Sequence, residues 1–182
     1  QEKKINLDSK LIHIIPELRY KDKRVENITI KSLLNHTSGL NDVNTYHWKN
    51  NHQSKNSLKD YILGLNLTLL SEPLTAYHYS NLGYNILGFI IEKVSKTNFD
   101  EFAKSNILIP SNMPNSDFRY FKIADTLKTA PHSKRMISKK IYKRKIYPYT
   151  REQAPSSTLN SSAHDLSNWM ISFLKSANNS SS

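Results

Sequence analysis

Tyr79 and Asn81 are the residues of this 182-residue chain whose types and spacing point most directly to chemistry. Side chains at positions i and i+2 of an extended segment point to the same side, so the two can face one cleft while Ser80 turns away from it. A phenol can exchange a proton, and a carboxamide can both donate and accept hydrogen bonds. The pair suits acyl-transfer chemistry but contains no nucleophile. The same residues also fit a structural interpretation, with Tyr79 packed and Asn81 capping the next helix.

Other candidates for a nucleophile or a metal ligand are weaker. Ser172 and Lys175 have the S-x-x-K spacing, but they follow the Tyr-x-Asn pair and stand near the end of an amphipathic helix, where such matches are common by chance. Ser38 lies in no G-x-S-x-G elbow, and we expect it and His36 to have structural roles at a helix C-terminus. The seven histidines show no metal-ligand spacing and there is no cysteine, so we predict neither a metal nor a cofactor.

Short helices have to position the pair. Thr29 can cap a helix over residues 30–36, with Gly39 in the left-handed position that follows its end. Apolar residues at helical spacing predict four further helices, over residues 57–65, 82–96, 99–106 and 162–174. Thr97 or Asn98 can cap the third of these. The chain is therefore expected to be mostly helical, with a small amount of strand and no internal repeat.

The formal charge of +11, from 26 basic and 15 acidic residues, is concentrated in one segment. Residues 119–151 hold eleven basic residues and one acid, Asp125, and so carry +10 against +1 for the rest of the chain. Within this segment, basic and apolar side chains alternate over residues 137–149, which suggests a two-stranded hairpin. Basic residues interleaved with tyrosines could bind a polyanion, but no nucleic-acid-binding motif accompanies them, so nucleic acid is not the expected partner. Two other interpretations stay open: a solvated hairpin with a charged outer face, and attraction to an anionic cell-envelope polymer or membrane surface.

Four blocks of sequence, in order, resemble a known family. They read LLNHTSGL at residues 33–40, YSNLGYNILGFIIE at 79–92, LIPSNM at 108–113 and PSSTLNSSAHDL at 155–166. These blocks are similar to those of the serine β-lactamase-related family, which groups class C β-lactamases, D-alanyl-D-alanine carboxypeptidases and related esterases. One block alone would be a weak sign, but an ordered set that covers nearly the whole chain is specific.

The resemblance implies an α/β fold of the penicillin-binding-protein and β-lactamase type, of which this chain would supply mostly the helical subdomain plus a small hairpin. Residues 1–182 are expected to be the central part of a single domain. The family needs an S-x-x-K element before its Tyr-x-Asn element and a K-T-G or H-x-G element after it. Both are expected to lie outside this sequence, in an extracytoplasmic parent protein whose oligomeric state stays open.

The same resemblance implies roles for the two candidate residues. Tyr79 would pass the proton between the nucleophilic serine and the leaving group, and Asn81 would hydrogen-bond the substrate amide and hold the active-site lysine. The parent would be a serine hydrolase that opens a small-molecule or peptide substrate, a β-lactam, a D-alanyl peptide or an ester, through an acyl-serine intermediate. This piece alone is expected to be inactive. The alternative is a non-catalytic polyanion-binding module that uses residues 119–151.

The chain departs from the family pattern at three places. Leu74 follows Pro73 where the family often has glycine, and Asn112 stands where glycine is common. Asparagine tolerates the left-handed region of backbone space, so the second change is mild. Ser157 and Thr158 replace a usual Gly-Gly pair, a change expected to alter the backbone near the cleft.

Overall fold

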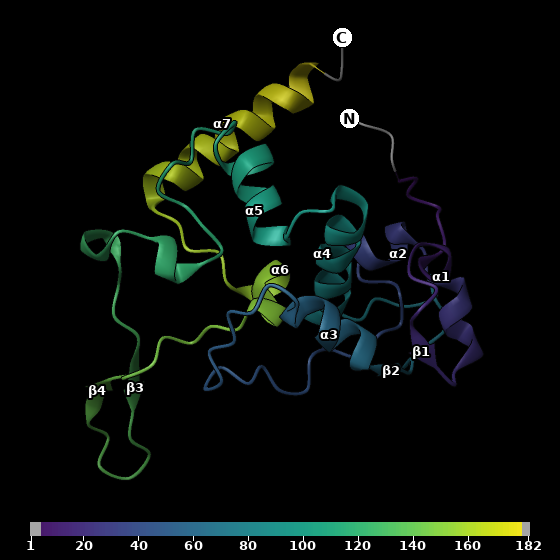
Figure 1. The fold of residues 1–182 in the computed structure, drawn as a ribbon, viewed down its shortest axis with the longest axis horizontal. Helices are drawn as coiled ribbons and strands as arrows, with labels where there is room; N and C mark the ends of the chain where they lie inside the picture. The colour runs from purple at the N-terminus through teal and green to yellow at the C-terminus, as the bar shows by residue number, and fades with distance from the viewer. Residues whose placement is uncertain (1–4, 180–182) are drawn as a thin grey trace.

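Helix α4 (Asn81–Ser95) is the central element of the structure, a computed structural model that describes residues 5–179 (Figure 1). Four shorter helices pack against it: α2 (Ile30–Leu34), α3 (Ser57–Gly64), α5 (Phe99–Ala103) and α6 (Ala154–Ser157). The longest helix, α7 (Ala163–Asn179), lies next to α5, and residues of both helices line an apolar hollow.

The remaining elements are short. They are α1 (Leu11–Ile14), β1 (Arg19–Tyr20), β2 (Asn66–Leu67), β3 (His132–Lys134) and β4 (Ile141–Lys143), the 3-10 helices η1 (Lys23–Asn27), η3 (Tyr120–Lys122), η4 (Asp125–Leu127) and η5 (Arg151–Gln153), and the π-helical turn η2 (Lys104–Leu108). Strand β1 pairs in parallel with β2, and β3 pairs antiparallel with β4. The described chain is therefore mostly helical with little strand, which confirms the prediction.

Helix α4 forms because its sequence places apolar residues on one face and a capping residue at its start. The Ser80 hydroxyl accepts a hydrogen bond from the Gly83 N–H at 3.1 Å, and Lys96 ends the helix in the left-handed conformation. The buried face meets side chains of α1, α2 and α3 in one apolar core, whose fully buried members include Leu11, Ile15, Val25, Ile28, Leu58, Ile62 and Ile86. None of the helices in residues 5–179 is long and apolar enough to cross a bilayer.

The start of α2 confirms the predicted cap, but its end differs from the prediction. Thr29 and Ser32 form a reciprocal capping box, in which each side chain accepts from the other residue's N–H. The left-handed position after the helix is held by His36, with φ of +59°, and not by Gly39. Gly39 is left-handed as well, with φ of +75°, but its role is a close approach: a Cβ there would lie 2.3 Å from the Ser71 carbonyl oxygen.

Two further predictions of local structure differ from the structure in detail. The first N–H of α5, on Phe99, donates to Glu92 Oε1 at 3.0 Å, whereas the Asn98 side chain donates to Lys55 O and to Glu92 itself. Asn98 therefore holds the N-cap position, as predicted, but its side chain makes no cap hydrogen bond, and Glu92 on α4 accepts from the first N–H of α5 instead. The hairpin begins earlier than predicted, because β3 precedes the alternating segment and only β4 lies within residues 137–149.

The departures from the family pattern have visible backbone consequences. Leu74 has φ of +69° and Asn112 has φ of +55°, so both stand in the left-handed region that glycine occupies without strain. Thr158, at the end of α6, has φ of −118°, which any residue can adopt. Glycine is therefore favoured by backbone conformation at positions 74 and 112, but not at 158.

Candidate active site

The extended segment before α4 is fastened to the end of α2 through His36. The His36 carbonyl accepts from the His78 N–H at 2.8 Å, and its Nδ1 accepts from the Ser80 N–H at 3.2 Å. Because Nδ1 accepts a hydrogen bond, it carries no proton in this arrangement. His36 thus has the structural role that was predicted, and it fixes the backbone on both sides of Tyr79.

The structure places Tyr79 and Asn81 in one pocket of about 570 Å³ and turns Ser80 away from it, as their spacing predicts. The Tyr79 hydroxyl donates to Asn81 Oδ1 at 3.1 Å. Ser80 is buried, and its hydroxyl donates to the Asn41 carbonyl at 2.8 Å while it caps α4. The purely structural interpretation of Asn81 as a cap is wrong, because Ser80 holds that position.

Asp42 and Tyr46 orient the Asn81 carboxamide. The Asp42 carboxylate accepts from the Asn81 N–H at 2.7 Å and from Asn81 Nδ2 at 3.3 Å, and the Tyr46 hydroxyl accepts from Nδ2 at 2.7 Å. An ionised carboxylate can only accept, so Nδ2 has to face Asp42 and Oδ1 has to face Tyr79. Both hydrogens of the amide group are then used, while Oδ1 keeps one free lone pair.

Sequence reasoning missed Asp42 and Tyr46. Both lie in residues 41–56, a polar stretch without helical or strand periodicity, and they are separated by 39 and 35 residues from Asn81. No local pattern links them to the Tyr-x-Asn pair. Burial first, and then the nearby Asp42 carboxylate, raise the pKa of the Tyr46 phenol, while hydrogen bonds with Ser157 and Asn81 act in the opposite direction. Tyr46 therefore stays protonated at neutral pH and can donate its own hydrogen.

Aromatic rings form one wall of the pocket. The His36 ring lies 4.5 Å from the Tyr79 ring and 5.1 Å from the Tyr84 ring, centroid to centroid. The Tyr84 hydroxyl donates to the Leu34 carbonyl at 3.0 Å, which fixes that ring against the end of α2. Tyr79 still has 56% of its surface exposed, so its phenol is held in place and yet open to solvent.

Helix α6 supplies another part of the lining. Ser156 and Ser157 line the pocket, and their hydroxyl oxygens lie 2.8 Å apart. No lysine is among the described residues that line it, so neither hydroxyl has there the lysine partner of an S-x-x-K element. Ser172 and Lys175 lie on α7, outside this lining, and Ser38 is buried. Within residues 5–179, no three His, Asp or Glu side chains gather as a metal ion requires.

The model of the family described as Beta-lactamase matches residues 1–182. The chain belongs to the beta-lactamase family. It is similar to penicillin-binding protein 4* of Bacillus subtilis (strain 168), with 36% identity over 92 residues, 48% of this chain and 20% of that protein. It is also similar to protein flp of Staphylococcus aureus (strain N315), with 30% identity over 122 residues, 65% of this chain and 24% of that protein. The match thus spans about a quarter or less of these curated relatives.

Solved structures establish the fold. D-amino acid amidase from Ochrobactrum anthropi SV3, complexed with D-phenylalanine, superposes with a TM-score of 0.72 at 17% identity, covering 93% of this chain and 49% of that chain. The predicted penicillin-binding-protein and β-lactamase type of fold is therefore confirmed, and the described residues supply a mostly helical part of it. Family membership makes this chain part of a hydrolase family.

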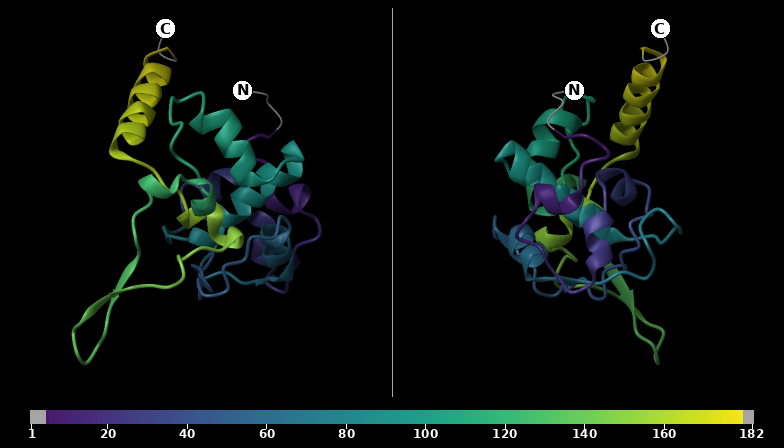
Figure 2. Two further views of the ribbon diagram at one scale, coloured as in Figure 1. Left: turned by 60° about the vertical axis from the view of Figure 1, so that its left-hand side comes forward. Right: turned by 90° about the vertical axis from the view of Figure 1, so that its right-hand side faces the viewer.

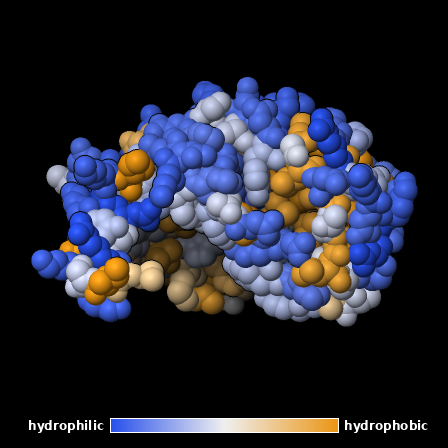
Figure 3. Space-filling view, turned by 90° about the horizontal axis from the view of Figure 1, so that it is seen from below, coloured by the Kyte–Doolittle hydropathy of each residue, from blue (hydrophilic) through white to orange (hydrophobic). Residues whose placement is uncertain are grey.

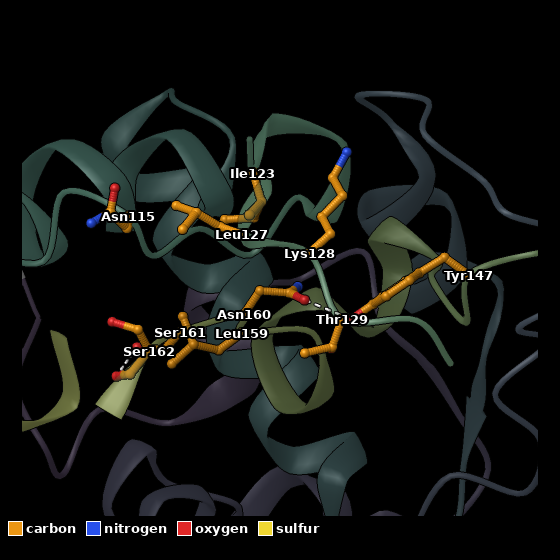
Figure 4. Close-up of a pocket in the computed structure, with 10 residues that line it drawn as sticks. All are labelled: Asn115, Ile123, Leu127, Lys128, Thr129, Tyr147, Leu159, Asn160, Ser161 and Ser162. Atoms are coloured by element: carbon orange, nitrogen blue, oxygen red, sulfur yellow. Dashed lines mark hydrogen bonds between the residues drawn. The ribbon is translucent and has the colours of Figure 1, made fainter. Parts of the chain in front are cut away.

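A second hollow, of about 330 Å³, adjoins the pocket through Leu159, which lines both (Figure 4). Its walls bear polar groups, and the Tyr147 hydroxyl donates to Asn160 Oδ1 at 2.6 Å. Lys128 is its one basic lining residue among those described, and its ammonium pairs with Asp125 at 2.7 Å. The pocket of Tyr79 and Asn81 and this second hollow are therefore neighbours that share Leu159.

Arg119 and Arg151, the basic residues at the two ends of residues 119–151, form buried ion pairs. Arg119 makes two hydrogen bonds of 2.9 Å to the Asp117 carboxylate, and Arg151 lies 2.7 Å from Asp100. Both arginines and both acids are largely buried. These two arginines are therefore unavailable to bind a polyanion, and the accessible positive charge of residues 119–151 is centred on the β3–β4 hairpin.

Proposed function

We propose that this chain is the central part of a serine hydrolase that opens an ester or amide through an acyl-serine intermediate. In this proposal Tyr79 moves the proton between the nucleophile and the leaving group, and Asn81 orients the substrate amide and the active-site lysine. The observation that supports it best is the 3.1 Å hydrogen bond between the two side chains in one pocket, with the Asn81 amide fixed by Asp42 and Tyr46.

The hydrogen bonds of Asn81 fit the role proposed for it. Its Nδ2 already donates to two partners, so any further partner has to approach Oδ1. The free lone pair on Oδ1 accepts only from a donor, such as a lysine ammonium or a substrate N–H. The Asp42 carboxylate close by favours a positive charge at this place.

Tyr79 fits the role of a proton shuttle only when a cation joins it. Tyrosine accepts a proton as its phenolate, and a nearby positive charge favours that form over the neutral phenol. The described lining of the pocket contains no lysine or arginine, and neither of its serines belongs to an S-x-x-K element. We therefore propose that the serine and lysine of an S-x-x-K element come from another part of the parent protein, and that residues 1–182 alone are inactive.

The substrate and the location are further proposals. A β-lactam, a D-alanyl peptide or an ester fits the proposed chemistry, which would make the parent a β-lactamase, a carboxypeptidase or an esterase. The similarity to a penicillin-binding protein supports a β-lactam among these substrates, and the proposed extracytoplasmic location rests on the family resemblance alone.

The test of the proposed role uses the parent protein that contains this chain. Tyr79→Phe is expected to lower kcat/KM for nitrocefin or a p-nitrophenyl ester by about a hundredfold or more, since positioned proton transfer contributes at least that factor. Tyr77→Phe is the matched control, because Tyr77 is 65% exposed, lies two residues away and does not line the pocket. Equal activity of the two variants would refute the role of Tyr79.

A second test addresses inactivity of the piece alone. The purified 182-residue chain is expected to turn over neither substrate and not to be labelled by a fluorescent penicillin. Turnover that Ser172→Ala abolishes would show that the chain carries its own nucleophile and would overturn the proposal. Coding sequence for S-x-x-K ahead of residue 1 is the expected genetic counterpart.

A further inference from the structure

The β3–β4 hairpin projects away from the helices, and three views show it as the most isolated part of the described chain (Figures 1 and 2). Its register pairs His132 with Lys143 and Lys134 with Ile141. Arg135 closes the loop, because its N–H donates to the Lys140 carbonyl at 2.9 Å and its carbonyl accepts from the Lys139 N–H at 3.1 Å. The hairpin is thus an ordered projection with a closed tip.

Two apolar side chains stand at that tip. Met136 is 87% exposed and Ile137 is 97% exposed, the largest exposed fractions among the large apolar residues of residues 5–179. Ile141, at the start of β4, is 72% exposed. The view from below shows apolar surface on the projecting part, set among hydrophilic surface (Figure 3). Such exposure is costly in water unless a partner covers it.

The same hairpin is surrounded by positive charge. The sequence has no acid between Asp125 and Glu152. Seven basic residues lie within positions 132–146: Lys134, Arg135, Lys139, Lys140, Lys143, Arg144 and Lys145. The ion pairs found in the described part of the chain include none of them. The Arg135 guanidinium instead lies 5.8 Å from the centre of the Tyr142 ring.

We propose that the β3–β4 hairpin docks on an anionic lipid bilayer, with Met136 and Ile137 inserted among the head groups and the basic residues on the lipid phosphates. Binding to a bilayer surface strengthens with the apolar area that is buried and with electrostatic attraction to anionic lipids, and the hairpin presents apolar and basic side chains at one end. Tyr142, 47% exposed beside Arg135, is of the type that accumulates at membrane interfaces. A soluble polyanion would engage only the charges and would leave Met136 and Ile137 in water.

Sedimentation with lipid vesicles tests the docking on the 182-residue chain itself, whose folding is checked by circular dichroism. Vesicles of phosphatidylcholine mixed with phosphatidylglycerol are expected to bind the chain, and vesicles of pure phosphatidylcholine to bind it far less. Added salt is expected to weaken the binding, because it screens the basic patch. No sedimentation with the anionic vesicles would refute the proposal.

Two sets of variants separate the two signals. Met136→Ser with Ile137→Ser is expected to weaken binding about tenfold or more, whereas Ile109→Ser, at a residue 51% exposed elsewhere on the surface, should leave it unchanged. Each basic residue near an anionic surface strengthens binding about fivefold, so Lys139→Gln with Lys140→Gln should weaken it about 25-fold. The exposed lysines Lys21 and Lys49, changed to glutamine together, serve as the charge-matched control.

A tryptophan at the tip reports insertion directly. The fluorescence of Ile137→Trp is expected to shift to the blue on anionic vesicles, and that of Ile109→Trp is not. If the tip serine variant binds vesicles undiminished, and heparin displaces the chain equally well, the hairpin attracts polyanions through charge alone and docking by insertion is refuted. None of these outcomes depends on the proposed hydrolase activity.

Discussion

Replacing Gly88 with alanine should separate α6 from α4 and destabilise the chain. Gly88 lies within α4, and a Cβ atom there would stand 2.1 Å from Pro155 Cγ and 2.6 Å from Pro155 Cβ. Pro155 belongs to α6, which also carries Ser156 and Ser157 of the candidate site. The glycine thus lets α6 approach α4 closely enough to form one wall of the pocket.

The expected loss of stability in Gly88→Ala is the difference between two opposing effects. Alanine is the better helix former by about 1 kcal/mol. Overpacking a close contact costs about 1–3 kcal/mol, and the proline ring cannot rotate out of the way, so the cost at this contact is near the upper end of that range. We expect a net loss of about 2 kcal/mol, which for a chain of this size lowers Tm by roughly 4–8 °C.

Gly64→Ala is the matched control, because Gly64 lies at the end of α3 with no atom within 4 Å of an added Cβ. We expect it to leave the free energy of unfolding unchanged or to raise it by a few tenths of a kcal/mol. Thermal and urea unfolding followed by circular dichroism measure both variants. A Gly88→Ala variant as stable as Gly64→Ala would refute the contact, as would a Gly88→Ala, Pro155→Gly double variant whose loss equals the sum of the single losses.

Three other substitutions give outcomes that unfolding experiments can check. Burial raises the pKa of Glu92, so the folded state holds the proton more tightly than the unfolded state does. The free energy of unfolding therefore falls as pH rises above about 4. Glu92→Gln can still accept from the Phe99 N–H, and its urea midpoint should exceed that of wild type at pH 7 but not at pH 4. The Arg24 side chain lowers the pKa of Asp22, so this pair stabilises the fold above pH about 4 and loses that effect in acid. Asp22→Asn should therefore unfold earlier than wild type at pH 7, and the difference should narrow as the pH falls below about 4. Thr29→Ala removes a cap and should cost about 1 kcal/mol, whereas Thr29→Ser should restore most of it.

The helices could be predicted from the sequence because their signals are local. Apolar residues at spacings of three and four predict a helix over residues 82–96, and α4 spans Asn81–Ser95. The hairpin could not be placed in the same way. Strand β3 reads His-Ser-Lys and lacks apolar alternation, and the turn depends on Lys139 in the left-handed conformation, which lysine seldom adopts.

The residues of the candidate site also fall into two groups: those that a local pattern predicts and those that only the tertiary fold brings together. The i, i+2 rule is a property of the backbone, so it placed Tyr79 beside Asn81 without any tertiary information. Asp42 and Tyr46 reach Asn81 only because residues 41–56 fold back over the start of α4, and nothing local in that stretch encodes the path. The hydrogen bond from the Phe99 N–H to Glu92 escaped prediction for a related reason, since Asn98 at the N-cap position offered a local acceptor that its side chain does not provide.

The hydrogen-bond inventory of Asn81 also limits what can join the site. Its two amide hydrogens face Asp42 and Tyr46, and its oxygen faces the Tyr79 hydroxyl. An additional carboxylate could find no donor on this amide, whereas an ammonium could bind Oδ1 and stand close to the Tyr79 phenol at the same time. Such a cation would favour the ionised phenol, and an ionised Tyr79 could no longer donate to Oδ1, which frees that oxygen for a second donor. The geometry around Asn81 therefore favours the addition of a lysine together with a substrate N–H over the addition of any acidic group.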